Sequence, residues 1–266
     1  MFRDITIGQY YPVDSKIHSL DPRVKLFAIL MYIVTLFCFD SIFGMAVIVI
    51  GLVVVIKLSK VPFSFMVKGL RGIIMILVIA GFFNLFFTPG KPLVTLWRLT
   101  ITDVGLKNAF IMLFRMVLLI IGSSMLTLTT TPNQLTDGLE KSLGFLSKIK
   151  FPVHEVAMMM SIALRFIPIL IEETDKIMKA QMARGADFES GGLIKKAKAM
   201  VPLLVPLFVS AFRRANDLAL AMEARCYNGG EGRTRMKPLK YDGQDQLAYI
   251  CIGIYLVLFF IVKAAL

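Results

Sequence analysis

The chain of 266 residues is strongly apolar: 57% of its residues are hydrophobic and only 18% are charged. A soluble domain has about 45–50% apolar and about 25% charged residues, so this composition predicts a membrane protein and excludes a disordered or collagen-like chain. The net charge is +12, and in a membrane protein such an excess is typical of cytoplasmic loops. The basic residues do not alternate with aromatic ones as in a single-strand binder. We therefore expect membrane lipid, and no nucleic acid, as a partner.

The sequence indicates no metal or disulfide chemistry. Its three cysteines, Cys38, Cys226 and Cys251, are scattered and odd in number, which predicts neither a disulfide framework nor metal-ligand spacing. His18 and His154 are isolated, and we expect an interfacial helix cap and a surface position for them. The first 23 residues are mostly polar and lack the apolar core of a cleavable signal peptide, so we expect the N-terminus to be retained.

Five apolar runs predict about five transmembrane helices, since a crossing takes about 20 apolar residues. The runs are 24–39, 42–56, 72–87, 109–128 and 247–262. Residues 57–71, between the second and third run, contain basic residues and no acidic one; the basic residues are Lys57, Lys60, Lys68 and Arg71. Such a loop is typical of the cytoplasmic side, so we expect a cytoplasmic N-terminus. Asp21 followed by Pro22 predicts a helix N-cap with a structural role.

The segment 132–245 differs in character, because it carries dense charges of both signs and only two strongly apolar stretches, 156–171 and 201–212. Neither is a clean span of about 20 residues, and the sequence leaves open whether they enter the bilayer. We therefore predict three domains: an N-terminal membrane domain of about four transmembrane helices (1–130), a cytoplasmic domain (131–245) and a C-terminal transmembrane helix (246–266).

The cytoplasmic domain contains two long amphipathic patterns. In the second pattern, apolar or small residues recur at steps of three and four from Leu193 to Met222, which predicts one face of a helix roughly 45 Å long. This face includes Met200 and Leu204, together with a stripe of small residues at Ala211, Ala215 and Ala219 that would permit close approach of another helix. The first pattern follows the same spacing through Ala163, Ile167, Leu170, Thr174, Ile177 and Gln181.

Both patterns end in the same way. Arg184 and Arg225 lie 41 residues apart, and each closes an Ala-x-x-Ala-Arg sequence that is followed by a small residue. A single arginine at such a place could simply complement the negative end of its own helix. Two matching ends favour two similar acidic partners, or one partner used twice, because a guanidinium group is able to bind a carboxylate with two hydrogen bonds. The candidate docking residues are Ala183, Arg184, Gly185, Ala224, Arg225 and Cys226.

The two tips resemble the paired X-Arg-X motifs of EcfT, the transmembrane scaffold subunit of energy-coupling factor (ECF) transporters. Residues 20–26 (LDPRVKL) resemble the opening segment of that family, and residues 129–139 (TTTPNQLTDGL) resemble the start of its first coupling helix. The resemblance runs the length of the chain. It departs at Cys226, where the first tip has Gly185. The fold class it implies is an all-α membrane protein with about five transmembrane helices and long amphipathic cytoplasmic coupling helices that cross one another.

The resemblance also implies partners and a mechanism. Two ABC-type ATPases would each receive one tip, and a small substrate-binding membrane protein, the S-component, would contact the crossed helices at Ala211, Ala215, Ala219, Met200, Leu204 and Ile167. ATP-driven closure of the ATPases would reorient the S-component and drive vitamin uptake across a prokaryotic cell membrane. The chain itself would be no enzyme and would hold no cofactor, because ATP and magnesium would be bound by the ATPases and the chain has no phosphate-binding loop sequence.

Two other classes of function are alternatives for a membrane protein of this composition. An autonomous secondary transporter would need inverted repeats and polar sites at the membrane midplane, and the sequence displays neither. A membrane-embedded enzyme would need a clustered acid, base or nucleophile, which is also missing from the sequence. The identity of the transported vitamin or metal and the choice of ATPase for each tip stay open at this stage.

Overall fold

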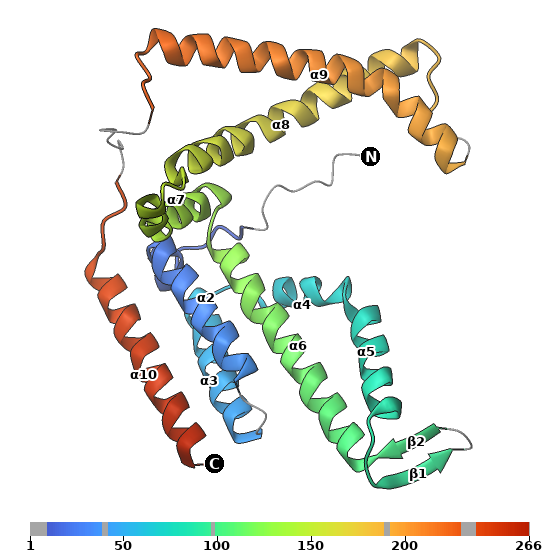
Figure 1. The fold of residues 1–266 in the computed structure, drawn as a ribbon, viewed down its shortest axis with the longest axis vertical. Helices are drawn as coiled ribbons and strands as arrows, with labels where there is room; N and C mark the ends of the chain where they lie inside the picture. Colours follow the sequence, from blue (N-terminus) through green and yellow to red (C-terminus); the bar gives the residue numbers. More distant parts are fainter. Residues whose placement is uncertain (1–9, 39–41, 97–98, 189–191, 230–237, 266) are drawn as a thin grey trace. The chain divides into compact units, whose positions relative to one another are not determined.

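A computed structural model describes residues 10–38, 42–96, 99–188, 192–229 and 238–265 (Figure 1). The chain divides into two compact units. Of the described residues, those in 10–141 and 239–265 form the larger unit, and those in 142–238 form the smaller unit. The boundaries of the three predicted domains are close to these divisions in sequence but stay predictions.

The larger unit consists of helices and one short hairpin. Its elements are α1 (Lys16–Ser19), α2 (Pro22–Phe37), α3 (Ile42–Ser59), α4 (Phe63–Arg71), α5 (Ile74–Phe87), β1 (Pro92–Leu96), β2 (Leu99–Thr102), α6 (Asp103–Thr129), α7 (Pro132–Ser142) and α10 (Gly243–Ala265). Asp21 caps α2 by accepting a hydrogen bond from the N–H of Arg23, and Pro22 occupies its first turn, as the sequence predicts. The N-cap of α6 is Thr102, which accepts from the N–H of Gly105.

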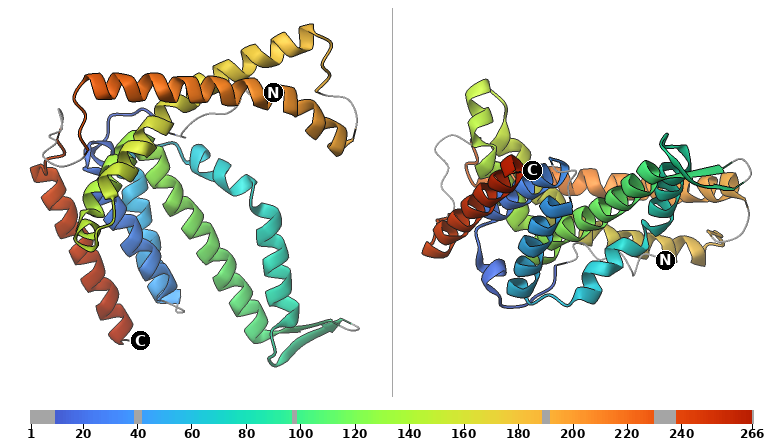
Figure 2. Two further views of the ribbon diagram at one scale, coloured as in Figure 1. Left: turned by 45° about the horizontal axis from the view of Figure 1, so that its top comes forward. Right: turned by 90° about the horizontal axis from the view of Figure 1, so that it is seen from below.

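The core of the larger unit lies where α2, α3, α4 and α6 meet. Figure 2 shows α2, α3 and α6 side by side from two directions. The buried residues that form this core are Leu36, Ile48, Leu52, Val61, Met66, Leu118, Ile121, Met125 and Leu128. The hydroxyl of Tyr32 donates to the carbonyl of Leu118 at 2.8 Å, and Gly122 leaves room for the same tyrosine ring. α2 and α6 therefore approach closely at a point where one residue has no side chain.

The helical fold class is confirmed. By length and composition, α6, α8 and Gly243–Ala264 of α10 are able to cross a membrane, while Gly44–Ser59 and α5 are shorter apolar helices. The number of membrane crossings therefore stays a prediction. The antiparallel hairpin of β1 and β2 was not predicted from the sequence; it follows a turn-forming sequence at residues 88–92 (TPGKP). β-branched residues after this turn favour extended backbone, and the hairpin joins α5 to α6 (Figure 1).

The smaller unit is built on two long helices. It contains the 3₁₀ helix η1 (Gly144–Ile149), α8 (Val153–Ala183) and α9 (Leu193–Ala224), so the predicted helix over 193–222 is confirmed. α8 and α9 contact each other. The side chain of Gln181 donates to the carbonyl of Pro202 at 3.4 Å. This carbonyl lacks its usual partner inside α9, because the residue four positions on is Pro206, which has no N–H.

Candidate functional site

The tip of α8 is closed by a pair of backbone hydrogen bonds. The N–H of Gly185 donates to the carbonyl of Met182 at 2.9 Å, and the N–H of Ala186 donates to the carbonyl of Gln181 at 3.0 Å. These are the two bonds of a Schellman motif, which satisfies carbonyl groups at a helix end. Arg184 is the C-cap residue, so its side chain leaves the helix from the last ordered turn.

The tip of α9 repeats this geometry. The N–H of Cys226 donates to the carbonyl of Glu223 at 2.9 Å, and the N–H of Tyr227 donates to the carbonyl of Met222 at 3.0 Å. Arg225 is again the C-cap residue. The sequence repeat that predicted two matching tips therefore corresponds to two copies of one backbone motif.

The two motifs differ in the residue that adopts the left-handed conformation. Gly185 has a φ of 89° and Cys226 has a φ of 56°. A left-handed φ costs a residue with a Cβ atom about 1–2 kcal/mol, whereas glycine adopts it without steric cost. Cys226 therefore keeps the shape of the tip but at a cost in local stability.

Exchanging these two residues tests this cost. Cys226→Gly should slow hydrogen exchange of the Tyr227 amide about fivefold, because about 1 kcal/mol of backbone strain is removed. Gly185→Cys should speed exchange of the Ala186 amide by a similar factor, since a Cβ atom at Gly185 meets open space and only the backbone conformation opposes it. Hydrogen-exchange mass spectrometry measures both rates. Unchanged rates in both variants would contradict the assignment of strain to Cys226.

The arginines at both tips are exposed to solvent. Neither Arg184 nor Arg225 forms an ion pair with a described residue, and both side chains are open to solvent. An exposed guanidinium at the end of a helix, with no ion-pair partner among the described residues, is able to bind a carboxylate on another protein. Docking of an ATPase at these six tip residues stays a prediction.

An apolar groove lies between α8 and α9 in the smaller unit. It has a volume of about 280 Å³, and α9 lines it with Ala211, Ala215 and Ala219, the small-residue stripe of the sequence. Ile162, Phe166 and Leu170 of α8 form the other side. The stripe thus leaves an open apolar space, because alanine side chains are too short to fill the gap between the helices.

The other residues predicted to contact a partner are exposed on the same two helices. Met200, Leu204 and Ile167 are 47%, 44% and 37% exposed. Such a set of apolar side chains facing away from the protein interior is typical of a surface that contacts a partner or lipid. Contact of these three residues with a partner stays a prediction.

One ion pair across the two helices was not predicted from the sequence. Nη2 of Arg214 in α9 lies 3.0 Å from Oε2 of Glu173 in α8, and both side chains are partly exposed. Arg214 also lines the groove. A partly exposed pair contributes at most about 1 kcal/mol to stability, so it orients the two helices more than it stabilises them. The pair joins residues 41 positions apart, and no local sequence pattern indicates it.

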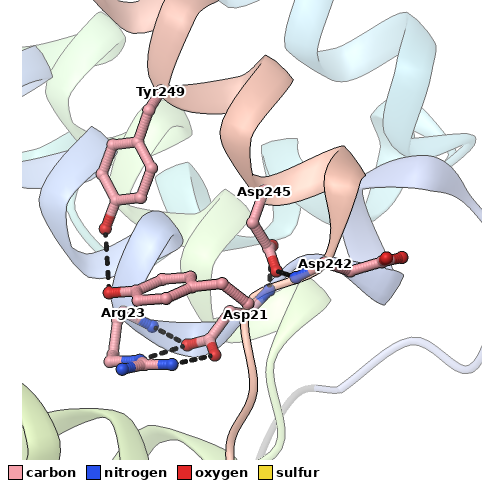
Figure 3. Close-up of polar contacts among 6 residues, drawn as sticks. Asp21, Arg23, Asp242, Asp245 and Tyr249 are labelled. Atoms are coloured by element: carbon pink, nitrogen blue, oxygen red, sulfur yellow. Dashed lines mark hydrogen bonds and ion pairs between the residues drawn. The ribbon is translucent and has the colours of Figure 1, made fainter.

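A polar cluster joins the starts of α2 and α10 in the larger unit (Figure 3). The carboxylate of Asp21 accepts from Nε and Nη2 of Arg23 at 3.0 and 2.8 Å. Arg23 also lies over the ring of Tyr241, 3.8 Å from its centroid, where a cation is attracted to the aromatic face. Asp245 of α10 accepts from the backbone N–H of Asp21 at 2.8 Å. We call Asp21, Arg23, Tyr241 and Asp245 the clasp.

The protonation of Asp21 depends on Arg23. Burial acts to raise the pKa of Asp21, but the hydrogen bonds and the positive charge of Arg23 together outweigh it and lower that pKa below the ordinary value of 3.8. A lowered pKa means that the ion pair stabilises the folded state above this ordinary value, and that the stabilisation is lost as the pH falls through the lowered pKa.

This dependence gives a measurable difference between the wild type and Asp21→Asn. At neutral pH the variant should be less stable by about 1.5–3 kcal/mol, because a charge-assisted hydrogen bond is lost while Asn still caps the helix. The difference should shrink as the pH falls below 3.8. Thermal unfolding in detergent, followed by circular dichroism, measures it. A difference that stays constant down to pH about 2 would contradict the ionised state of Asp21.

Comparison with known proteins shows the family of the chain. A family model described as "CbiQ: Cobalt transport protein" matches residues 14–236. A relative from Clostridium kluyveri is 57% identical over 94% of each chain. Relatives from Thermosediminibacter oceani and Bacillus subtilis are 51% and 46% identical; the first match covers 96% of each chain, and the second covers 99% of this chain and 100% of the relative. All three bear the name energy-coupling factor transporter transmembrane protein EcfT.

The chain belongs to the EcfT family. The resemblance found in residues 20–26, 129–139 and the two tips is therefore confirmed at the level of the family. Members are transmembrane components of ECF transporters, so this chain is a transport component of the membrane that works with other components. The family description names cobalt and the names of the relatives specify no substrate, so the transported molecule is not assigned.

Proposed function

We propose that the chain is the non-catalytic coupling subunit of an ECF-type ABC importer. It links ATP hydrolysis by two ABC ATPases to reorientation of an S-component, and thereby to uptake of a vitamin or another micronutrient. The observation that carries this proposal is the pair of matching tips, in which Arg184 and Arg225 each occupy the C-cap of a Schellman motif. One backbone motif used twice suits two ATPases with similar binding grooves.

The two long helices suit the transmission of movement. α8 has 31 residues and α9 has 32, so each is about 45 Å or more in length. The groove between them offers an apolar surface to the S-component, along with the exposed Met200, Leu204 and Ile167. Methionine is flexible and polarisable, so a surface that contains it is able to adapt to more than one partner.

The proposal places the chain in the cytoplasmic membrane, with its N-terminus and the domain 131–245 on the cytoplasmic side. The basic residues of 57–71 support this orientation. The chain would bind no cofactor of its own, and ATP with its magnesium would be bound by the ATPases.

Reconstitution in liposomes separates this proposal from an autonomous transporter. The chain is inserted alone, or with the two ATPases and the S-components encoded in its genome, and tritiated riboflavin, thiamine, biotin and folate are tested as probes. We expect ATP-dependent accumulation of at least one vitamin in the complete system and of none with the chain alone. Accumulation by the chain alone would favour the secondary transporter, and accumulation in neither system would contradict vitamin import.

A further inference from the structure

The clasp lies close in sequence to one of the two places where the described part of the chain passes between its units. These junctions are at Lys141/Ser142 and Pro238/Leu239, and everything between them belongs to the unit of α8 and α9. Within the described residues, a displacement applied to the tips therefore has two covalent routes into the larger unit. At each route, residues 21–25 at the start of α2 contact the segment of the larger unit next to the junction.

At the first route, α2 holds the end of α6 and the face of α7. Lys25 is a buried residue, with 7% of its surface exposed. Its ammonium group donates to the carbonyl of Thr129, the last residue of α6, at 3.0 Å. α7 then packs on Pro22 through Gly138, where a Cβ atom would lie only 2.7 Å from the Cβ of Pro22. The approach is closer than any residue other than glycine allows. The path from α6 to Lys141 is thus fixed to α2.

At the second route, the clasp fixes the start of α10. Asp245 is 3% exposed and uses both carboxylate oxygens: one accepts from the N–H of Asp21, and the other accepts from the N–H of Asp242 at 2.8 Å. An acidic residue in the first turn needs only one oxygen to close its own helix. The oxygen that accepts from Asp21 therefore bonds a residue 224 positions away. Ser19 also donates a hydrogen bond to the side chain of Gln244 at 3.0 Å.

We propose that Asp21, Arg23, Lys25 and Asp245 are positioning residues for energy coupling. They tie both junctions of the α8–α9 unit to one helix end, so that movement of the tips reaches the membrane helices and is not absorbed by loose connections. The inference rests on the proposed function and extends it to residues that lie outside both the tips and the groove. It needs no new ligand, because the ties are hydrogen bonds, an ion pair and a close helix contact that the chain makes with itself.

The test compares transport with ATP hydrolysis in the complete complex. Asp245→Asn puts an amide N–H₂ against backbone N–H groups, and Arg23→Gln removes the fork from Asp21 and the cation from Tyr241. The matched control is Asp103→Asn, since Asp103 is also an acidic residue in the first turn of a long helix but is exposed. The quantity measured is vitamin imported per ATP hydrolysed in liposomes, with the tritiated vitamin that the wild-type complex accumulates.

We expect this ratio to fall about tenfold in Asp245→Asn and Arg23→Gln and to stay unchanged in Asp103→Asn, with complex yield and ATP hydrolysis within twofold of the wild type. An unchanged ratio would overturn the inference. So would a parallel loss of yield, hydrolysis and uptake, because that pattern indicates a purely structural role. Failure of the proposed function looks different, since the ATPases would then be missing from the wild-type complex.

A second measurement needs no transported vitamin. The amides of Asp21 and Asp242 both donate to Asp245, so in the complex they should exchange hydrogen slowly, and the protection should persist during ATP hydrolysis. Asp245→Asn should speed exchange at both amides together by at least tenfold. Loss of protection in the wild type on addition of ATP would overturn the inference, because the ties would then open during the cycle.

Discussion

Arg184→Glu and Arg225→Glu should each weaken binding of one ATPase by on the order of 2–5 kcal/mol, which is about 30-fold or more in the dissociation constant. In the proposed docking, each change removes a charge-assisted pair and leaves two negative groups facing each other. Stability of the isolated chain should barely change, because both side chains are exposed and form no ion pair with a described residue. Titration of the detergent-solubilised chain with each purified ATPase measures the two constants.

Arg213→Glu is the matched control for this prediction. Arg213 lies on α9, is exposed and does not line the groove, so the change has the same charge reversal away from the tip. We expect its ATPase affinity to stay within about twofold of the wild type. Equal losses in Arg213→Glu and Arg225→Glu would mean that net charge, and not the tip, governs binding.

Ala215→Leu should reduce retention of the S-component about tenfold and leave capture of the ATPases within twofold. Ala215 lines the groove between α8 and α9, and three additional carbon atoms would fill part of its roughly 280 Å³. A surface that loses its concave shape loses the contacts that a partner makes inside it. Purification of the tagged chain from its native membrane, followed by quantitative mass spectrometry of the small membrane proteins, measures the retention.

The neighbouring change Asn216→Leu gives the control. Asn216 is exposed on α9 and does not line the groove, since adjacent residues of a helix face different directions. The substitution Asn216→Leu introduces the same leucine side chain beside the groove, and it should leave both the ATPases and the S-component bound. Loss of the ATPases from Ala215→Leu alone would indicate that the two helices had been forced apart, and would contradict the assignment of the groove to the S-component.

The tips were predictable because their signal is local and repeated. Arg184 and Arg225 each close the same five-residue pattern, and helix ends of equal sequence form equal capping motifs. The long helix ending at Ala224 was predictable for a similar reason, because a spacing of three and four residues maintained over eight turns has no other regular structure. Neither inference required knowledge of a distant contact.

The sequence predicted one part of the clasp, the helix cap at Asp21, but not its contact with Asp245. The sequence indicates that Asp21 caps a helix, and the structure confirms it. That Asp245 reaches the same point from the other end of the chain cannot be read from either local sequence, because the pairing depends on how α2 and α10 pack. The ion pair of Glu173 with Arg214 was missed for the same reason. Contacts between distant residues follow from tertiary packing, and one sequence alone does not contain that information.

The most direct test of the central claim is purification of the tagged chain from its native membrane in mild detergent, next to the Arg184→Glu/Arg225→Glu double variant. Every co-purifying protein is identified in both samples. We expect two ABC ATPases and small membrane proteins with the wild type, and the small membrane proteins without the ATPases with the variant. Recovery of the wild-type chain without any ATPase, or equal recovery of both ATPases with the double variant, would contradict the claim that these tips couple the chain to ATP hydrolysis.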